Sequence, residues 1–395
     1  MENEMRNNRH DESPWRSLET IFETRSPFLE KTLFMEGFDI SSNVYVIAGD
    51  YLTIIDPGND YTVFMALFDR GFKPTDIKKI VFTHGHFEHV MGTFELLGYP
   101  SIVKNGEIEI IFHESGPVSF REAADEYRSA VKYTEVGGGE TLNLSGFELE
   151  VIHTPGHTMD SICLYHAETR SLFTGDTVLP YAVSSPDPAG GGKIEYHLFT
   201  LKRLSAMNID NVLPGHGIPI QSEGKKVIEG ALTGVIRRMV GLETSWLEGA
   251  AKLAGKGYLE EAVFCCKKEL EVDCENVGAL ELLGASLNDL GRFREAIDVF
   301  DKVRKFHKNN IYATIGKGYA LMGLTRYEDS LKYFDDALKI NPKIKATSIY
   351  KGMALYLTGR VDEAMDIEDF QTEFVGKLKD WVDAKGQPAN PSDKP

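Results

Sequence analysis

A repeat of 34 residues in the second half of the chain constrains the fold more than any other sequence feature. Three sets of positions recur with this period, and we call each set a column: one of leucine, one of glycine and one of small residues. Their members are Leu253, Leu287, Leu321 and Leu355; Gly284, Gly318 and Gly352; and Ala262, Ala296, Ser330 and Ala364. In residues 257–262, 291–296 and 359–364, the small residue follows a turn that begins with glycine and leads into an amphipathic helix. The period predicts a stack of helix pairs, each burying its columns against its neighbours.

This pattern resembles tetratricopeptide repeats, with four units in register from about residue 242 to 373. Phe300 and Phe334 share a further column, and Pro342 follows the end of a predicted helix, since proline cannot continue one. We expect an all-α repeat domain at residues 242–385, in which residues 374–385 form a capping helix. Residues 386–395 are expected to be a flexible tail.

The first helix of each repeat would present an apolar, aromatic face. Its residues are Tyr312, Ile315, Tyr319, Met322, Ile349, Met353 and Tyr356. An exposed face of this kind is typical of an interaction surface. It could bind a protein partner, a second copy of the chain or the first domain. The face has no clamp of Lys and Asn, so capture of an acidic peptide terminus is disfavoured.

The first half of the chain carries a cluster of metal-competent side chains. Residues 83–89 read Thr-His-Gly-His-Phe-Glu-His and follow an apolar run that predicts a buried strand. Imidazole is the commonest protein ligand for zinc and iron. Alternate histidines, His84 and His86, can therefore face one cation while Glu88 and His89 face another.

Three later turns each place one metal-competent side chain beside a glycine, after an apolar stretch. These side chains are His157, Asp176 and His216. No Gly-x-Ser-x-Gly motif is present that would indicate a serine nucleophile. The sequence therefore predicts metal-dependent chemistry at the ends of several strands.

The order His-x-His-x-acid-His, then His, Asp and His, between residues 56 and 216 resembles the metallo-β-lactamase superfamily of hydrolases. Residues 43–58 resemble its opening hairpin, in which Asp56 would lie behind the metal loop and hydrogen-bond a ligand histidine. The resemblance implies an α+β chain: an αββα sandwich at residues 28–235, after an N-terminal extension at residues 1–27, and then the repeat domain.

The resemblance also implies two divalent metal ions, zinc in the first place, with iron or manganese as alternatives. His84, His86 and His157 would hold one ion, Glu88, His89 and His216 the other, and Asp176 would bridge them. Two such ions about 3.5 to 4 Å apart lower the pKa of a shared water and supply hydroxide near neutral pH. The catalytic side chains would be Glu88 and Asp176.

Glu88 departs from the pattern, because the family usually has Asp at this position. The extra methylene moves the carboxylate further than metal geometry tolerates, so we expect a weakened second site. A single iron on His84, His157 and Asp176 would then resemble the sulfur dioxygenase branch, an oxidoreductase. A third hypothesis is a vestigial metal domain that serves as an interaction scaffold. The flavodiiron branch is disfavoured, because it has Glu where this chain has His86.

Composition narrows the choice of function. The net charge of −17 disfavours nucleic acid as a substrate or partner, since its binders need basic surface. No run of 18 apolar residues indicates a membrane span. Four cysteines without CxxC spacing and a polar N-terminus suit the cytoplasm. The 395 residues exceed what one core usually supports, which favours two domains.

We therefore expect a cytoplasmic metal-dependent hydrolase of a small ester, thioester or lactone, fused to a repeat domain that binds a protein partner or another copy of the chain. Lactam hydrolysis is disfavoured because it is typically a secreted activity. A glutathione thioesterase is disfavoured because no glutathione-binding segment is recognisable.

Other positions carry weaker expectations. Three histidines are expected to face solvent: His113, His166 and His307. Residues 186–192, Pro-Asp-Pro-Ala-Gly-Gly-Gly, predict a flexible loop that is either a lid or a plain surface loop. Tyr181, Tyr196 and His197 fall near the expected substrate pocket, where a packing role is favoured. The pattern leaves the secondary structure of residues 98–133 open.

Overall fold

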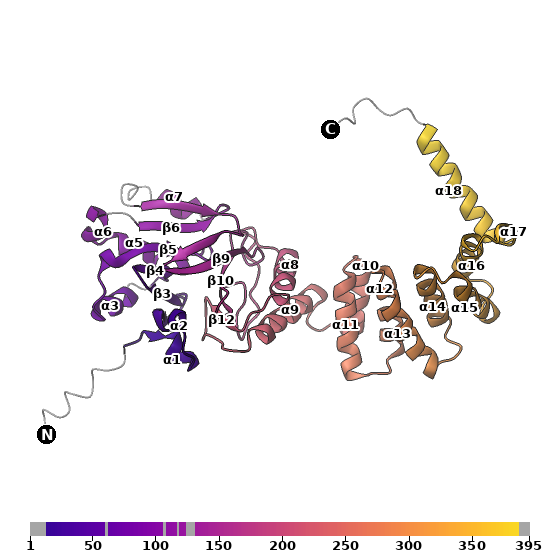
Figure 1. The fold of residues 1–395 in the computed structure, drawn as a ribbon, viewed down its shortest axis with the longest axis horizontal. Coiled ribbons are helices and arrows are strands. Elements are labelled where there is room, and N and C mark those ends of the chain that lie inside the picture. Colours follow the sequence, from indigo (N-terminus) through magenta and orange to yellow (C-terminus); the bar gives the residue numbers. More distant parts are fainter. Residues whose placement is uncertain (1–12, 60–61, 106–107, 117, 124–130, 387–395) are drawn as a thin grey trace, which may run out of the picture. The chain divides into compact units, whose positions relative to one another are not determined.

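The computed structural model describes residues 13–59, 62–105, 108–116, 118–123 and 131–386. The chain divides into two compact units, Met1–Met239 and Val240–Pro395. Figure 1 shows strands and helices in the first and helices alone in the second. Each unit is described by itself.

The first unit contains a seven-stranded sheet in the order β1-β2-β3-β4-β5-β6-β7. Its strands are β1 (Arg16–Ser17), β2 (Thr32–Met35), β3 (Val44–Ala48), β4 (Leu52–Ile55), β5 (Ile77–Val81), β6 (Ile108–His113) and β7 (Val131–Val136). Pairing is antiparallel from β1 to β4 and parallel from β4 to β7. The helices between the strands are α1 (Leu18–Phe22), α2 (Pro27–Lys31), α3 (Thr62–Asp69), α4 (Phe87–Val90), α5 (Gly92–Leu97), α6 (Pro100–Asn105) and α7 (Val118–Ala123), with a 3-10 turn at Pro74–Asp76.

A second sheet has five strands in the order β12-β11-β10-β9-β8. They are β8 (Thr141–Leu144), β9 (Phe147–His153), β10 (Ile162–His166), β11 (Ser171–Gly175) and β12 (Asn211–Pro214). Only β11 and β12 pair in parallel, which brings Gly175 beside Pro214. Two further helices complete the unit, α8 (Ile194–Ser205) and α9 (Gly224–Val240).

The two sheets pack face to face. One core cluster joins Phe34, Tyr45 and Val81 of the first sheet to Leu164 and Phe173 of the second. Another cluster lies on the opposite face of the first sheet and combines strand residues with side chains from α3, α5, α6 and α7. Helices thus cover the sheets on the outside (Figure 1), as the αββα prediction required.

The structure adds detail in one segment that the sequence pattern leaves open, and it differs from two expectations for this unit. Residues 98–133, for which the pattern predicts no particular structure, contain α6, β6 and α7, and β6 and β7 extend the first sheet. The expected N-terminal extension contains Trp15, Leu18 and Phe22, all buried in the core. Two histidines expected to face solvent are buried: His113 stacks on His153, and His166 stacks on Phe28. Ring partners that are distant in sequence stack on these histidines and shield them from solvent.

The second unit is a run of antiparallel helix pairs. Its helices are α10 (Trp246–Gly255), α11 (Leu259–Val272), α12 (Val277–Asp289), α13 (Phe293–Phe306), α14 (Ile311–Gly323), α15 (Tyr327–Ile340), α16 (Lys345–Leu357), α17 (Val361–Met365) and α18 (Glu368–Gly386). Consecutive helices contact each other throughout the run. This is the stack that the 34-residue period predicted.

The structure explains the glycine column of the repeat. A Cβ atom on Gly284 would lie 2.5 Å from the Phe300 ring, and one on Gly318 would lie 2.7 Å from the Phe334 ring. Both rings are buried. Glycine on the first helix of a pair therefore lets the aromatic ring of the second helix pack directly against the backbone.

The end of the repeat run differs from the prediction. The second helix of the last unit, α17, has only five residues, and α18 begins at Glu368 rather than near residue 374. Phe370 of α18 packs over Gly352, the place that an aromatic residue of the second helix takes in earlier units. No helix in the described part of the chain is long and apolar enough to cross a membrane.

Candidate metal centre

The sandwich brings the metal-competent side chains together from five segments. His84 and His86 lie in the loop after β5, whereas Glu88 and His89 lie in α4. The other metal-competent side chains follow β9, β11 and β12; they are His157, Asp176 and His216. Parallel pairing of β11 with β12 places the last two turns side by side.

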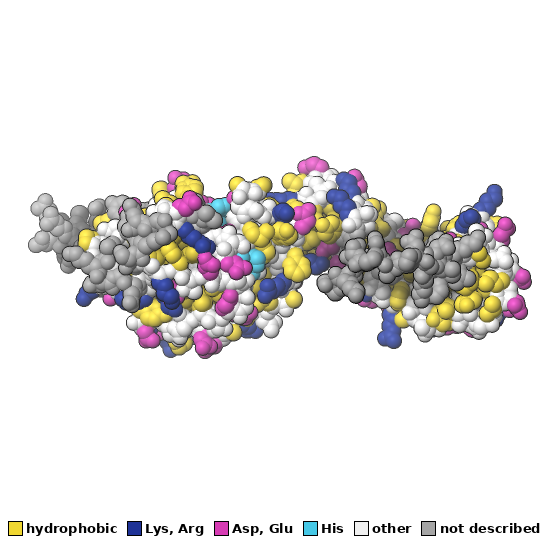
Figure 2. All heavy atoms as spheres, turned by 90° about the horizontal axis from the view of Figure 1, so that it is seen from above, with side chains coloured by type: hydrophobic (Ala, Val, Ile, Leu, Met, Phe, Trp, Pro, Cys, Tyr) yellow, Lys and Arg dark blue, Asp and Glu magenta, His cyan; other side chains and the backbone are white. Residues whose placement is uncertain are grey.

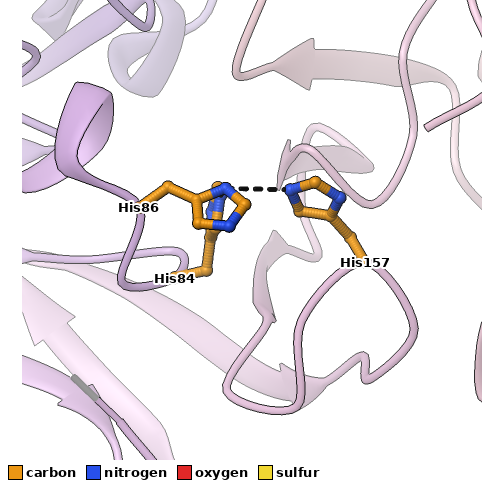
Figure 3. Close-up of side chains that lie close together, drawn as sticks. All are labelled: His84, His86 and His157. Carbon is orange, nitrogen blue, oxygen red and sulfur yellow. Dashed lines mark hydrogen bonds between the residues drawn. The ribbon is translucent and has the colours of Figure 1, made fainter. Parts of the chain in front are cut away.

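Three histidines form the first group. His86 Nδ1 lies 3.1 Å from His84 Nε2 and 3.2 Å from His157 Nε2. Figure 3 shows the three rings converging from two separate loops. Together they could hold one metal ion.

The carboxylate of Asp176 lies between this group and the remaining ligands. Its Oδ2 is 3.8 Å from His157 Nε2 and 3.6 Å from His216 Nε2. Its Oδ1 is 3.5 Å from His89 Nε2. This position is the one that a bridging ligand requires.

Glu88, His89 and His216 form another group whose ligand atoms lie within 4.8 Å of one another. The Glu88 carboxylate also lies 3.7 Å from His86 Nδ1. The Glu88 carboxylate thus lies beside the other candidate ligands, and the weakened second site stays a prediction. From the first turn of α4, the longer side chain reaches the ligand cluster.

Hydrogen bonds on the outer side of the rings fix which nitrogen of each ring carries hydrogen. His89 Nδ1 donates to Asp56 Oδ2 at 2.8 Å. His157 Nδ1 donates to the Ser185 carbonyl at 2.7 Å, and His86 Nε2 donates to Asp187 Oδ2 at 3.0 Å. With hydrogen on their outer nitrogens, the neutral rings of His86 and His157 present their inner nitrogens to the cluster as lone-pair acceptors.

Asp56 also holds the start of the metal loop. Its two oxygens accept hydrogen bonds from the Thr83 backbone N–H at 2.7 Å and the Thr83 hydroxyl at 2.6 Å. The same hydroxyl oxygen can then accept from His84 Nδ1, 3.2 Å away. A single buried carboxylate thus orients two histidines, a function that the resemblance assigned to it for one.

Charges in the cluster are strongly coupled. Burial opposes a charged ring at His89, but the carboxylates of Asp56 and Asp176 outweigh it and raise the pKa of His89 to about 10. Burial, followed by the neighbouring His89 charge, holds the pKa of His84 well below its ordinary value. Burial also lowers the pKa of His157. His84 and His157 are therefore neutral at pH 7, the state in which imidazole binds metal.

The residues present fit a cation. His89 Nε2 and Asp176 Oδ1 are buried and make no hydrogen bond to any described residue. His86 Nδ1 lies within 3.2 Å of the inner nitrogens of His84 and His157, and with hydrogen on each outer nitrogen these facing lone pairs would be stabilised by a cation between them. Divalent metal ions suit this set of nitrogen and carboxylate ligands.

Two glycines in the ligand turns are required by close packing. Gly175, which precedes Asp176, has a φ of 46°, and a Cβ there would meet the Thr83 hydroxyl. A Cβ on Gly215, which precedes His216, would meet Asp176 Oδ1. The turns thus need glycine because the ligands lie so close together.

Sequence reasoning missed the outer partners of two ligands. Asp187 lies 101 positions from His86, and Ser185 contacts His157 through its backbone carbonyl. Neither carries a local motif signal.

Of the residues expected near the pocket, Tyr181 and Tyr196 are exposed, whereas His197 is buried and donates from Nε2 to the Thr177 carbonyl. Burial lowers the pKa of His197 to about 4, which suits a structural role beside the Asp176 turn.

The fold and the cluster define a class of protein: an αββα domain with a ligand set for divalent metal. The family model of the metallo-β-lactamase superfamily matches residues 37–216, and that of the tetratricopeptide repeat matches residues 315–369. A probable metallo-hydrolase of Methanocaldococcus jannaschii is 32% identical over 197 residues, which cover 47% of this chain and 92% of that protein. The chain belongs to the metallo-β-lactamase superfamily of hydrolases and carries tetratricopeptide repeats after the hydrolase domain.

Other relatives match less of their own length. An atrochrysone carboxyl ACP thioesterase of Emericella nidulans is 26% identical over 201 residues, covering 50% of this chain and 58% of that protein. The chain spans about half the length of this and similar thioesterases. Among solved structures, a metallo-β-lactamase family protein of Thermus thermophilus is 21% identical with a TM-score of 0.42, covering 57% of this chain and 93% of that one.

Proposed function

We propose that the first unit hydrolyses a small ester, thioester or lactone at a two-metal centre. The observation that carries this proposal is the convergence of histidine nitrogens around Asp176, whose carboxylate lies within 4 Å of His89, His157 and His216. The proposed ligands are His84, His86, Glu88, His89, His157, Asp176 and His216. Bound divalent ions would supply a hydroxide nucleophile near neutral pH and stabilise the developing oxyanion.

The position of each side chain in the cluster indicates its proposed role in hydrolysis. Asp176 lies between the two proposed ligand groups, so its carboxylate would contact an ion bound in either group. Glu88 lies at the edge of the cluster, 20% exposed, and can orient the attacking water toward the substrate. Outer carboxylates and carbonyls keep the rings in the tautomer that presents a lone pair.

The surface near the cluster suits a substrate with an apolar portion. Five exposed apolar side chains lie on segments that flank the ligands: Phe38, Ile40, Phe87, Met91 and Ile218. The loop after β2 contacts the metal loops, since Ser42 N donates to the Glu88 carbonyl and Asn43 N to the Gly215 carbonyl. Figure 2 shows hydrophobic side chains beside a histidine on one face of the first unit. The names of several relatives as thioesterases support an acyl substrate.

The test combines metal analysis with a substrate panel. Protein purified without added metal is assayed for zinc, iron and manganese, then for hydrolysis of para-nitrophenyl esters, N-acetylcysteamine thioesters and homoserine lactones of increasing acyl length. We expect two metal equivalents and a rate that increases with acyl length. One iron with oxygen consumption, and no hydrolysis, would instead support the sulfur dioxygenase alternative. A metal-free, inactive protein would support the scaffold hypothesis.

We further propose that the repeat unit binds a partner protein through a groove of about 500 Å³. Aromatic and apolar residues line it, including Tyr312, Ile315 and Tyr319 of the predicted face. Two acidic residues, Glu281 and Asp289, also line it, and no basic side chain is among its lining residues. Carboxylates beside aromatic rings favour a cation. The proposed occupant is a partner segment with Lys or Arg next to an apolar residue.

Selection of random peptides displayed on phage, with the full chain immobilised, tests this proposal. We expect enrichment of peptides that carry a basic residue beside an apolar one. Glu281→Gln with Asp289→Asn should remove the basic preference. Glu248→Gln with Asp336→Asn, which changes the charge equally outside the groove, should not. Enrichment of acidic or purely apolar peptides would contradict the proposal.

A further inference from the structure

Residues 183–192 lie between the Asp176 turn and α8, and their backbone is fixed on one side by Arg238 of α9. The guanidinium donates from Nη2 to the Val183 carbonyl at 2.6 Å. It also donates from Nη1 to the Ser184 carbonyl at 2.8 Å and the Ser185 hydroxyl at 3.0 Å. One planar side chain thus holds three consecutive residues, which a lysine could not do.

On the other side, the same segment is bonded to the ligand loop that carries His157. Asp187 N donates to the His157 carbonyl at 2.7 Å, and Gly192 N donates to the Asp187 carbonyl at 2.7 Å. A Cβ on Gly192 would meet the His157 carbonyl oxygen. These contacts favour neither a lid nor a plain surface loop, because the segment is hydrogen-bonded to Arg238 and to the His157 loop.

The side chain of Asp187 is itself held in place. Its Oδ1 accepts from Ala189 N at 2.9 Å, and its Oδ2 accepts from Gly190 N at 3.0 Å. The same Oδ2 lies 3.0 Å from His86 Nε2. A carboxylate fixed by its own turn therefore determines which nitrogen of His86 carries hydrogen.

We propose that residues 183–187 form an outer clamp on the first ligand group, with Asp187 and Arg238 as positioning residues. Asp187 holds His86 with Nε2 protonated and Nδ1 directed to the metal. Arg238 holds the Ser185 carbonyl where it accepts from His157 Nδ1 and leaves Nε2 for the metal. The inference rests on the proposed metal centre. Outer partners of this kind typically contribute about 10- to 100-fold to metal affinity.

Asp187→Asn is the sharpest test, because it preserves shape. The neutral amide can accept on one side only. With its oxygen on Ala189 N it directs a donor at both Gly190 N and His86 Nε2, and with its oxygen on His86 it loses the Ala189 N bond and the negative charge, so the hold on the His86 tautomer weakens in either orientation. We expect zinc affinity, measured by competition with a chromophoric chelator, to fall about 10- to 100-fold. The visible spectrum of the cobalt-substituted variant should also change. Asp210→Asn, a control in an ion pair with Arg170 outside the site, should leave both unchanged.

Thermal unfolding of the metal-free proteins separates positioning from folding. The proposal expects Asp187→Asn to unfold within a few degrees of the parent when both lack metal. Loss of metal affinity together with a large loss of metal-free stability would overturn the clamp in favour of a purely structural turn. Affinity within twofold of the parent would also overturn it while leaving the metal centre intact. A parent that binds no metal would overturn both proposals.

Discussion

The metal centre and the repeat groove are built over very different distances along the chain. Candidate ligands at the centre come from α4 and from loops between residues 84 and 216, and the contacts behind them extend to Arg238. Groove residues lie on consecutive helix pairs between residues 278 and 350, each pair contacting the next. The centre therefore depends on long-range register, whereas the groove depends on local packing repeated several times.

This contrast predicts different responses to mutation. At the centre, every ligand is coupled to the others through shared charge and hydrogen bonds, so one loss changes the chemistry of the whole site. In the repeat unit, each helix pair contacts mainly its neighbours, so the effect of one change remains local. The following predictions test this difference.

Removal of a central ligand should have the largest effect. His86→Ala and Asp176→Ala are each expected to abolish hydrolysis and to lower metal content, because each removes a ligand from the middle of the cluster. Metal analysis beside the ester assay checks this. The control is His307→Ala, which replaces an exposed histidine of the repeat unit and should change neither hydrolysis nor metal content. Full activity at unchanged metal content in either ligand variant would contradict the site.

Metal binding should be strongly pH-dependent. In the metal-free protein His89 retains its proton up to a pKa of about 10, whereas His84 and His157 are already neutral at pH 7. A metal ion must displace the His89 proton, so affinity should rise about tenfold per pH unit between pH 7 and 9. Calorimetry in buffers of different ionisation enthalpy measures the released proton. Asp56→Asn, which removes a partner of His89, should reduce that release.

Shortening the acidic side chain in α4 should weaken one ligand group selectively. Because the Glu88 carboxylate reaches His89 and His216, Glu88→Asp should withdraw it from the second group. We expect one metal equivalent to bind several-fold more weakly while the other is unchanged, as seen in a two-phase chelator titration. A gain in occupancy would show that the extra methylene is a poor fit after all.

The smallest effect is expected in the repeat unit. Gly284→Ala places a methyl group against the buried Phe300 ring and should destabilise this unit by about 1–3 kcal/mol through overpacking. Gly376→Ala in α18 meets nothing within 4 Å, so it should instead be neutral or stabilising by up to about 1 kcal/mol. Urea unfolding followed by helical circular dichroism compares the two. A loss of metal content in Gly284→Ala would contradict the local behaviour proposed for the repeats.

Local and periodic features could be predicted from the sequence. Ala296 and Phe300 belong to positions that recur every 34 residues, because each helix pair packs against an equivalent pair. The helix stack can therefore be predicted from the sequence period. His84 and His86 are identifiable because metal ligands are chemically distinctive and follow a buried strand. The period places the end of the array too late, since α17 stops after five residues and Phe370 of α18 takes over its packing position.

Contacts between distant segments were decided only by the tertiary structure. The histidines His113 and His166 resemble surface residues in sequence, yet aromatic partners far along the chain bury them. Asp187 is an ordinary turn residue until folding places it 3.0 Å from His86. The sequence by itself determined how the helices repeat, and it predicts which side chains bind metal. The fold decided which nitrogen of each ring faces the cluster, because that depends on hydrogen-bond acceptors contributed by other loops.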